Sequence, residues 1–258
     1  MDNASIASPV KFSRWQAAGL HLLISACVAA IALFVMLRIW YPPPLFTAEG
    51  GTDLLFLLIA VDVVIGPLIT LIVFKAGKPS LRFDLSIIAL LQVGALVYGC
   101  HVMFVARPVY VALVGDQFET VRANDLDPAD IAKARVADFR SLPLAGPVYV
   151  AIDIPKDMSV LKHLIAEAQK GGKIVPHLPE YYVPYARQKA QAALQSQPLE
   201  PALKDGDDFA ILAQAYLRQS GRKASELKFM PLQTRRGYGT VLIDAQSGDI
   251  VTLLPPKP

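Results

Sequence analysis

Cysteine is scarce in this chain of 258 residues, and the part after residue 107 has none. The two cysteines, Cys27 and Cys100, lie in long apolar runs nearer the N-terminus. A disulfide framework is therefore excluded for the C-terminal part, although a compartment outside the cytosol would permit one.

The sequence also lacks the short motifs of common enzyme sites. It contains no G-x-S-x-G, no H-E-x-x-H, no G-x-x-x-x-G-K-[ST] and no cysteine pair with metal-ligand spacing. After residue 107 there are two histidines, His163 and His177, and their surroundings offer neither a paired nucleophile nor a set of zinc ligands. We therefore expect no enzyme activity, no metal and no cofactor.

Charged residues are few, at 18% against 53% hydrophobic residues, and the mean hydropathy of +0.40 is high for a soluble protein. Three apolar runs each hold about 20 residues, enough for a helix to cross roughly 30 Å of hydrocarbon. Residues 108–258 could not bury three such helices, so we predict three transmembrane helices within a membrane domain of residues 1–107. The predicted spans cover about 15–40, 53–75 and 83–106.

A cleaved signal peptide is the alternative for the first run, because Lys11 and Arg14 precede it. The run is too long for a signal peptide, and it ends in Arg38, Trp40 and Tyr41 before three prolines, rather than at a small-residue cleavage site. Retention as a membrane span is the better interpretation.

Lysine and arginine are absent from the first connection, YPPPLFTAEGGTD, which carries Glu49 and Asp53 instead. Basic residues precede the first run and fill the second connection, which places both on the cytoplasmic side. The N-terminus is then cytoplasmic, and everything after Arg107 lies outside. The basic residues are Lys11, Arg14, Lys75, Lys78 and Arg82. The net charge of +3 is small and gives no indication of nucleic-acid binding.

Residues 108–258 have the composition of a folded domain with alternating strands and helices. A hairpin is predicted around Gly115-Asp116, a helix from Asp127-Pro128 to about Phe139, and an amphipathic helix over 158–170. A strand at PVYVAID, two helices at 186–195 and 207–219, and three C-terminal strands complete the order ββα-βααα-βββ. The sequence therefore predicts an exported α+β domain.

An ionisable residue, Asp62, stands in the second apolar run and is followed by a Gly66-Pro67 break. It lies about 12 Å from the outer edge of the span, near the bilayer centre, where a carboxyl group must face protein or water. Asp62, Gly66 and Thr70 repeat at intervals of four and form one helix face suited to a close neighbour. Pro67 lacks the amide that would bond the carbonyl of Val63, so a kink is expected.

Complementary small and polar residues occur in the other spans, at His21, Ser25 and Ala29 and at Gln92, Ala95 and Gly99. By depth, Gln92 can reach Asp62. These groups either staple the three helices together, or dock the helix of a partner, or form part of an ion path. The last is disfavoured because the spans carry one deep carboxylate.

Two further groups of residues are candidates for a partner contact. Arg82 and Asp84 lie at the cytoplasmic interface, where they can pair at little cost and can also meet a charged group of a partner helix. Tyr181, Tyr182 and Tyr185 stand in the proline-rich segment VPHLPEYYVPY and offer the rigid amphipathic area that interfaces use. The alternative for the tyrosines is packing on their own domain.

Several stretches together resemble the type IV pilin accessory proteins of the TfpX/TfpZ family. In the membrane part these are SRWQAAGLHLLIS, WYPPPLF, DVVIGPLITLIVF, KPSLRFDLSIIALLQ and ARPVYV, and LPEYYVPY and VLIDAQSGDIV extend the similarity more patchily into the C-terminal domain. The resemblance implies a multi-pass protein of the bacterial inner membrane with a periplasmic C-terminal domain. It also implies a chaperone-like partner that helps its cognate major pilin to be stabilised, assembled and displayed.

The partners expected from this resemblance are the membrane helix and head of the pilin, the membrane lipid and components of the pilus assembly machinery. The resemblance carries no catalytic residues. Two other classes stay open: a membrane-anchored periplasmic sensor or ligand-binding protein, which lacks a cytoplasmic output domain, and an enzyme, which lacks visible acid–base residues.

Overall fold

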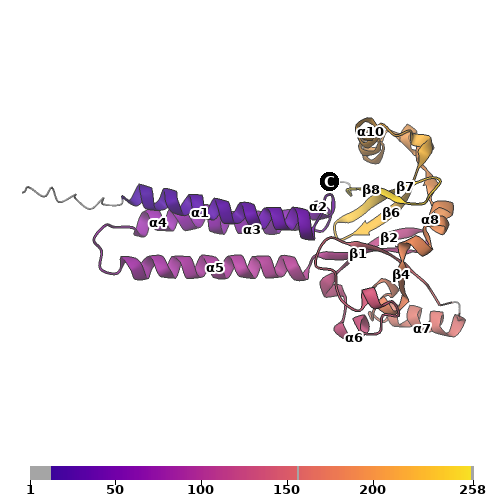
Figure 1. The fold of residues 1–258 in the computed structure, drawn as a ribbon, viewed down its shortest axis with the longest axis horizontal. Helices are drawn as coiled ribbons and strands as arrows, with labels where there is room; N and C mark the ends of the chain where they lie inside the picture. The colour runs from indigo at the N-terminus through magenta and orange to yellow at the C-terminus, as the bar shows by residue number, and fades with distance from the viewer. Residues whose placement is uncertain (1–12, 156, 257–258) are drawn as a thin grey trace, which may run out of the picture. The chain divides into compact units, whose positions relative to one another are not determined.

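The computed structural model describes residues 13–155 and 157–256 (Figure 1). Contacts divide the chain into two compact units. The helical unit consists of residues up to Phe34 together with Asp53–Val102, and the sheet unit consists of Val35–Thr52 together with Met103–Pro258. The sheet unit thus includes the connection between the first two apolar runs. Of the charges that orient the helices in the sequence, Lys11 lies outside the described residues.

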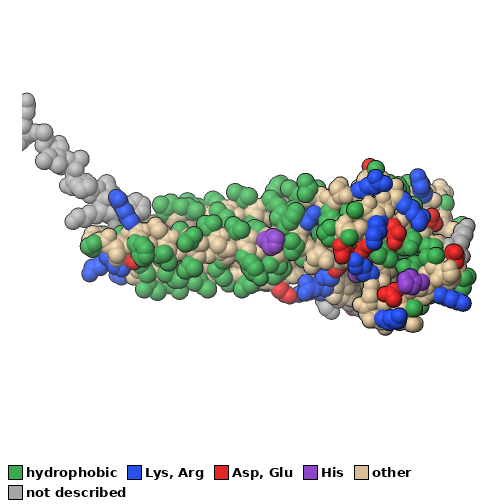
Figure 2. All heavy atoms as spheres, turned by 90° about the horizontal axis from the view of Figure 1, so that it is seen from below, with side chains coloured by type: hydrophobic (Ala, Val, Ile, Leu, Met, Phe, Trp, Pro, Cys, Tyr) green, Lys and Arg blue, Asp and Glu red, His purple; other side chains and the backbone are tan. Residues whose placement is uncertain are grey.

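Within the described part of the chain, three helices are long and apolar enough to span a membrane, as the sequence predicts. Only 11%, 28% and 6% of the residues in their most apolar stretches are buried, so most of their apolar side chains need lipid as a solvent. Hydrophobic side chains cover most of this unit in Figure 2. The three helices run over Arg14–Trp40, Gly51–Val73 and Leu81–Val105.

The second of these helices is irregular ahead of its proline. It consists of α3 (Gly51–Ile59), a π-helical turn (Ala60–Ile65) and α4 (Gly66–Val73). The amide of Gly66 donates to the carbonyl of Val61, five residues earlier, and the following Pro67 has no amide to donate. Where the sequence predicts a kink, the structure has this wider turn, and Asp62 lies inside it. The first helix likewise continues from α1 (Arg14–Val35) into a π-helical segment (Met36–Trp40), and α5 (Leu81–Val105) is regular.

The sheet unit has the predicted α+β character, with a sheet as its centre. Its strands are β1 (Pro108–Val114), β2 (Gln117–Arg122), β3 (Val148–Ile152), β4 (Tyr182–Pro184), β5 (Gln197–Pro198), β6 (Leu227–Thr234), β7 (Gly237–Asp244) and β8 (Ile250–Leu254). Its helices are α2 (Leu45–Ala48), α6 (Pro128–Ile131), α7 (Met158–Gln169), α8 (Lys189–Gln195), α9 (Leu199–Ala202) and α10 (Asp208–Ser220).

The strands form one mixed sheet in the order β4-β3-β1-β2-β6-β7-β8, and the short β5 pairs with β6. The pairs β1–β3 and β2–β6 are parallel and the others are antiparallel. Residues as far apart in this order as Ala151 of β3 and Leu253 of β8 belong to one buried cluster, so the sheet curls around it. We call this the central cluster.

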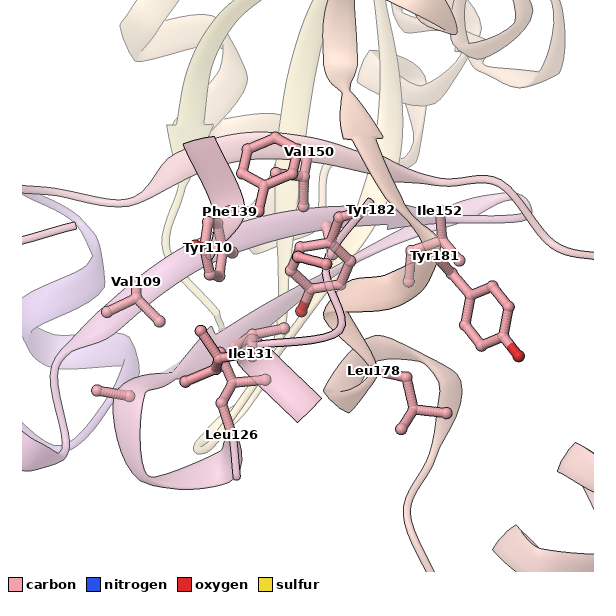
Figure 3. Packing of buried hydrophobic residues seen from close by; sticks show 14 of the residues in the cluster. Val109, Tyr110, Leu126, Ile131, Phe139, Val150, Ile152, Leu178, Tyr181 and Tyr182 are labelled. Carbon is pink, nitrogen blue, oxygen red and sulfur yellow. The ribbon is translucent and has the colours of Figure 1, made fainter. Parts of the chain in front are cut away.

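The opposite face of the sheet is covered by helices. Alternate residues of β1 point to different faces: Val111 and Leu113 enter the central cluster, whereas Tyr110 and Ala112 enter a second cluster with residues of α6 and α7. Figure 3 shows this second cluster, which we call the tyrosine cluster. A third cluster packs α10 and α9 against β6, β7 and β8.

Several local predictions differ from the structure. The helix expected up to about Phe139 ends at Ile131, and a 3₁₀ turn (Ala137–Phe139) follows, which brings the Phe139 ring to 5.9 Å from that of Tyr110. The segment expected to be irregular contains β4, whose backbone pairs with β3. Helix α8 starts at Lys189, three residues later than expected, after a 3₁₀ turn. The short β5 and α9 have no clear sequence pattern, because tertiary contacts hold them.

Candidate functional site

A cavity of about 480 Å³ opens within the helical unit. Its lining residues on α1 and on α5 recur at intervals of three and four, so each set forms one face of its helix. On α1 they are Ala17, Leu20, His21, Ile24, Ser25 and Val28; on α5 they are Leu85, Ala89, Gln92, Val93 and Leu96; and the second helix contributes Asp62, Thr70 and Phe74. We call this cavity the groove.

Asp62 is the only acidic residue among the groove's lining residues. Asp62 as a whole residue is 7% exposed, and its Oδ1 is buried with no hydrogen-bond partner among the described residues. A buried polar atom without a partner is costly, and proteins rarely keep one without a reason. The groove therefore holds an unused hydrogen-bond acceptor in an otherwise apolar setting.

Gln92 reaches Asp62, as predicted from its depth, but at the backbone. Its Nε2 donates to the carbonyl oxygen of Asp62 at 3.2 Å. The contact depends on a glycine, because a Cβ on Gly66 would lie 1.9 Å from that same Nε2. Gly66 therefore provides the space that lets α5 reach the π-helical turn, and the Asp62 carboxylate takes no part in this bond.

A second polar contact connects α1 to α4. His21 Nδ1 and Thr70 Oγ1 lie 2.6 Å apart, and Thr70 is 3% exposed. Gly66 and Pro67 are buried as well. Thr70 and Gln92 thus staple the three helices together, which is one of the roles expected for the Asp62 face. The carboxylate of Asp62 remains without such a role.

Arg82 and Asp84 lie in the first turn of α5, and neither lines the groove. Asp84 does not pair with Arg82. Its Oδ2 lies 2.6 Å from Lys78 Nζ and 3.2 Å from Ser80 Oγ. The Arg82 carbonyl accepts a bond from Ser86 Oγ at 2.8 Å. An ion pair this exposed contributes little to stability, so these residues have the character of a charged helix end.

The three tyrosines of the proline-rich segment pack on their own domain. Tyr182 is fully buried in the tyrosine cluster, 5.1 Å from Tyr110 between ring centroids, and its hydroxyl donates to the Pro176 carbonyl. Tyr185 is buried in the central cluster and donates to the Gly248 carbonyl at 2.7 Å. In Figure 3 the Tyr181 ring lies at the margin of the tyrosine cluster. Their burial leaves almost no tyrosine surface for a partner, and desolvation raises the pKa of Tyr182 and Tyr185.

The structure gives a role to the first connection that sequence reasoning missed. Leu45 is fully buried in the central cluster, and Tyr41 is 2% exposed and donates to the Met103 carbonyl at 2.8 Å. The apolar pair Leu45-Phe46 inside a loop was the available signal. The connection is therefore part of the sheet unit's core, although it lies far from that unit in the sequence.

Glu49, in the same connection, is a buried carboxylate with donors. Its Oε1 accepts from Thr120 Oγ1 at 2.6 Å and from the Arg235 amide at 3.5 Å, and the Arg236 amide donates to the neighbouring Ala48 carbonyl at 3.1 Å. Burial raises the pKa of Glu49, and the bond from Thr120 opposes this rise. Glu49 thus joins the connection to β2 and to the turn after β6.

Among the described residues, no three His, Cys, Asp or Glu side chains are placed to hold a metal ion together. The helical unit has a groove with one buried carboxylate oxygen that has no hydrogen-bond partner among the described residues. In the sheet unit, Arg107 Nε is likewise buried without a partner among these residues. The class these features define is a membrane-anchored protein with three spanning helices and a curled α+β domain.

Comparison with known proteins places this class more narrowly. The model of the family described as "Fimbrial assembly protein FimB" matches residues 10–50, which hold the first helix and most of the first connection. The chain is 27% identical, over 91% of both chains, to the fimbrial assembly protein of serogroup I from Dichelobacter nodosus. It is 34% identical to the serogroups C1 and C2 protein of that organism, over 84% of that protein and 42% of this chain. No solved structure matches. The chain belongs to the family of fimbrial assembly proteins.

Proposed function

We propose that this protein acts in type IV fimbrial biogenesis as a pilin accessory protein of the TfpX/TfpZ kind. It binds its cognate pilin in the inner membrane and assists the stability, assembly or display of that pilin without catalysing a reaction. Its relatives are named fimbrial assembly proteins, which supports the biogenesis role. The residues of the groove support the proposal that the protein acts by binding pilin.

The groove is the observation that carries the proposal. Its walls are single faces of α1 and α5, and the second helix supplies Asp62 and Thr70 between them. Large apolar side chains such as Leu20 and Val93 are about half exposed there, at 48% and 57%. A membrane helix laid along the groove would bury these side chains against protein and would gain packing contacts that lipid provides less well.

The sheet unit is the second part of the proposal. Basic residues at Arg14, Lys75, Lys78 and Arg82 favour a cytoplasmic location for these helix ends. This supports our proposal that the sheet unit lies in the periplasm. There it can meet the head of a membrane-attached pilin. Figure 2 shows charged side chains gathered on this unit, which suits a water-facing partner.

Site-specific photo-crosslinking in cells tests the proposal. A photoreactive residue replaces Leu20 or Val93 in the groove, and the matched controls are Leu22 and Leu91, which have similar exposure, at 45% and 68%, and do not line the groove. We expect the cognate pilin to be captured from Leu20 and Val93 and not from the controls. Equal capture from all four positions would remove the groove as the site, and absence of pilin from every adduct would refute pilin binding.

A further inference from the structure

We infer that the helix held in the groove carries a hydrogen-bond donor, either a hydroxyl, an amide or a cationic group, that pairs with Asp62 Oδ1. This inference rests on the proposed function and specifies the chemistry of its partner. It follows from Asp62, the side chain of the groove that has a buried oxygen with no hydrogen-bond donor among residues 13–155 and 157–256.

The depth of Asp62 makes the missing donor informative. Asp62 is the middle residue of the Gly51–Val73 helix, so it lies near the centre of the hydrocarbon layer. Lipid acyl chains have no donor to offer at that depth, and an unpaired acceptor there costs more than it would in water. A donor at the same depth must come from another membrane helix.

Three polar side chains of the groove, those of Gln92, His21 and Thr70, are already engaged. Gln92 Nε2 donates to the Asp62 carbonyl, and the His21 ring is bonded to the Thr70 hydroxyl at 2.6 Å. These bonds connect the three helices around the groove and do not use Asp62 Oδ1. A preorganised groove with one free acceptor is selective, because it rewards a helix that brings a donor and penalises one that does not.

The partner's other features follow from the lining. Most lining residues are apolar, among them Ile24, Val28 and Leu96, so the partner face must be apolar above and below the donor. A helix with one hydrogen-bond donor between apolar turns fits the acceptor and the apolar lining of the groove. Leu20 lies beside His21, which contacts Thr70, and Thr70 is about two turns from Asp62 along the second helix. We therefore expect one hydroxyl-, amide- or cation-bearing residue on the pilin helix about two turns from the position crosslinked by Leu20.

Variants at Asp62 test this pairing in the full-length protein with the photoreactive residue at Leu20. Asp62→Leu removes the acceptor, and we expect it to lower pilin capture about three- to fifteen-fold, the range of interhelical hydrogen bonds in membranes. Asp62→Asn keeps an acceptor oxygen and is expected to retain most of the capture. Asp84→Asn changes a carboxylate outside the groove and is the control.

A double-variant cycle then assigns the donor. The crosslinked pilin peptide is identified by mass spectrometry, and its nearest donor residue is changed to alanine. We expect this change to lower capture by the wild-type protein and to have no further effect on Asp62→Leu. Thermal unfolding of each Asp62 variant in detergent separates loss of binding from loss of folding.

The outcomes distinguish this inference from the proposed function. Capture of pilin from Leu20 that Asp62→Leu leaves unchanged would overturn the donor pairing while the groove remains the binding site. A pilin contact region without a donor would overturn it as well. Capture of no pilin by any variant would refute the proposed function and this inference with it.

Discussion

A buried carboxylate of the helical unit, Asp62, and one of the sheet unit, Glu49, differ in their hydrogen bonds. Glu49 of the sheet unit is 4% exposed and accepts hydrogen bonds from Thr120 and from the Arg235 amide. Asp62 of the helical unit is 7% exposed, and its Oδ1 has no partner among the described residues. Glu49 therefore has hydrogen-bond donors among the described residues, whereas Asp62 Oδ1 has none.

This difference is the reason for proposing that Glu49 has a structural role and that Asp62 pairs with a partner. The sheet unit packs many of its apolar side chains into buried clusters, and one of these includes Leu45 of the first connection. The helical unit leaves large apolar side chains exposed, such as Phe56 at 71% and Ile72 at 74%. A unit dissolved in lipid can leave apolar surface open, but it cannot satisfy a carboxylate without another polar group.

The largest expected effect tests whether the first connection belongs to the core of the sheet unit. Leu45→Ala removes a fully buried side chain from the central cluster and is expected to lower the free energy of unfolding by about 3 kcal/mol. Leu144→Ala is the control in the same unit, since Leu144 is 71% exposed. Thermal unfolding and limited proteolysis in detergent measure both. Equal stability of the two variants would show that the connection is not part of this core.

A smaller loss of stability is expected when Glu49 loses its hydrogen-bond donor. Thr120→Val keeps the side-chain shape and leaves the buried carboxylate without its 2.6 Å bond, which we expect to cost about 2 kcal/mol. Thr240→Val on β7 is the comparison and should change stability by less than about 0.5 kcal/mol. A Thr120 variant as stable as the wild-type protein would mean that Glu49, like Asp62, is not stabilised by its surroundings.

The ionisation of Glu49 gives a pH-dependent test of intermediate size. Because burial raises the pKa of Glu49 in the folded protein, folding takes up a proton, and stability falls as the pH rises from the ordinary glutamate value through the raised one. Glu49→Gln removes this ionisation and keeps an oxygen for Thr120. Above that pH range the variant should unfold about 2 to 4 °C higher than the wild-type protein. Below the range the two curves should converge, and a constant offset at every pH would contradict the assignment.

The smallest expected effect concerns Asp62 itself. In the purified protein without pilin, Asp62→Leu removes a buried oxygen that has no hydrogen bond. The unfolding temperature in detergent should therefore stay unchanged or rise slightly. The matched Glu49→Leu should be clearly less stable, because it loses the bond from Thr120. A large loss of stability in Asp62→Leu would show that Asp62 is structural and would remove the contrast between the two carboxylates.

Local patterns were enough to predict most elements of both units. The strand-like stretch Ile250–Leu254 and the proline after Asp127 gave a strand and a helix start at the right places. The groove was harder to predict from the sequence. The depth of Asp62 and the spacing of Gly66 and Thr70 predicted a packing face, and the predicted contact between Gln92 and Asp62 is confirmed. The side chains of Tyr182 and Tyr185 could not be placed, because aromatic residues in a proline-rich segment suit an interface and a core equally well.

The sequence by itself determined which residues form helices long and apolar enough to span a membrane, which residues form the α+β part, and the order of the helices and strands. Apolar runs long enough to cross a bilayer and alternating strands are local properties, and each is legible in a window of 20 residues or fewer. Only the tertiary structure decided that Leu45 and Glu49 belong to the sheet unit and that Asp62 keeps an oxygen unpaired. Both depend on contacts between residues far apart in the chain, such as Glu49 and Thr120, and no local pattern records which donor reaches which carboxylate.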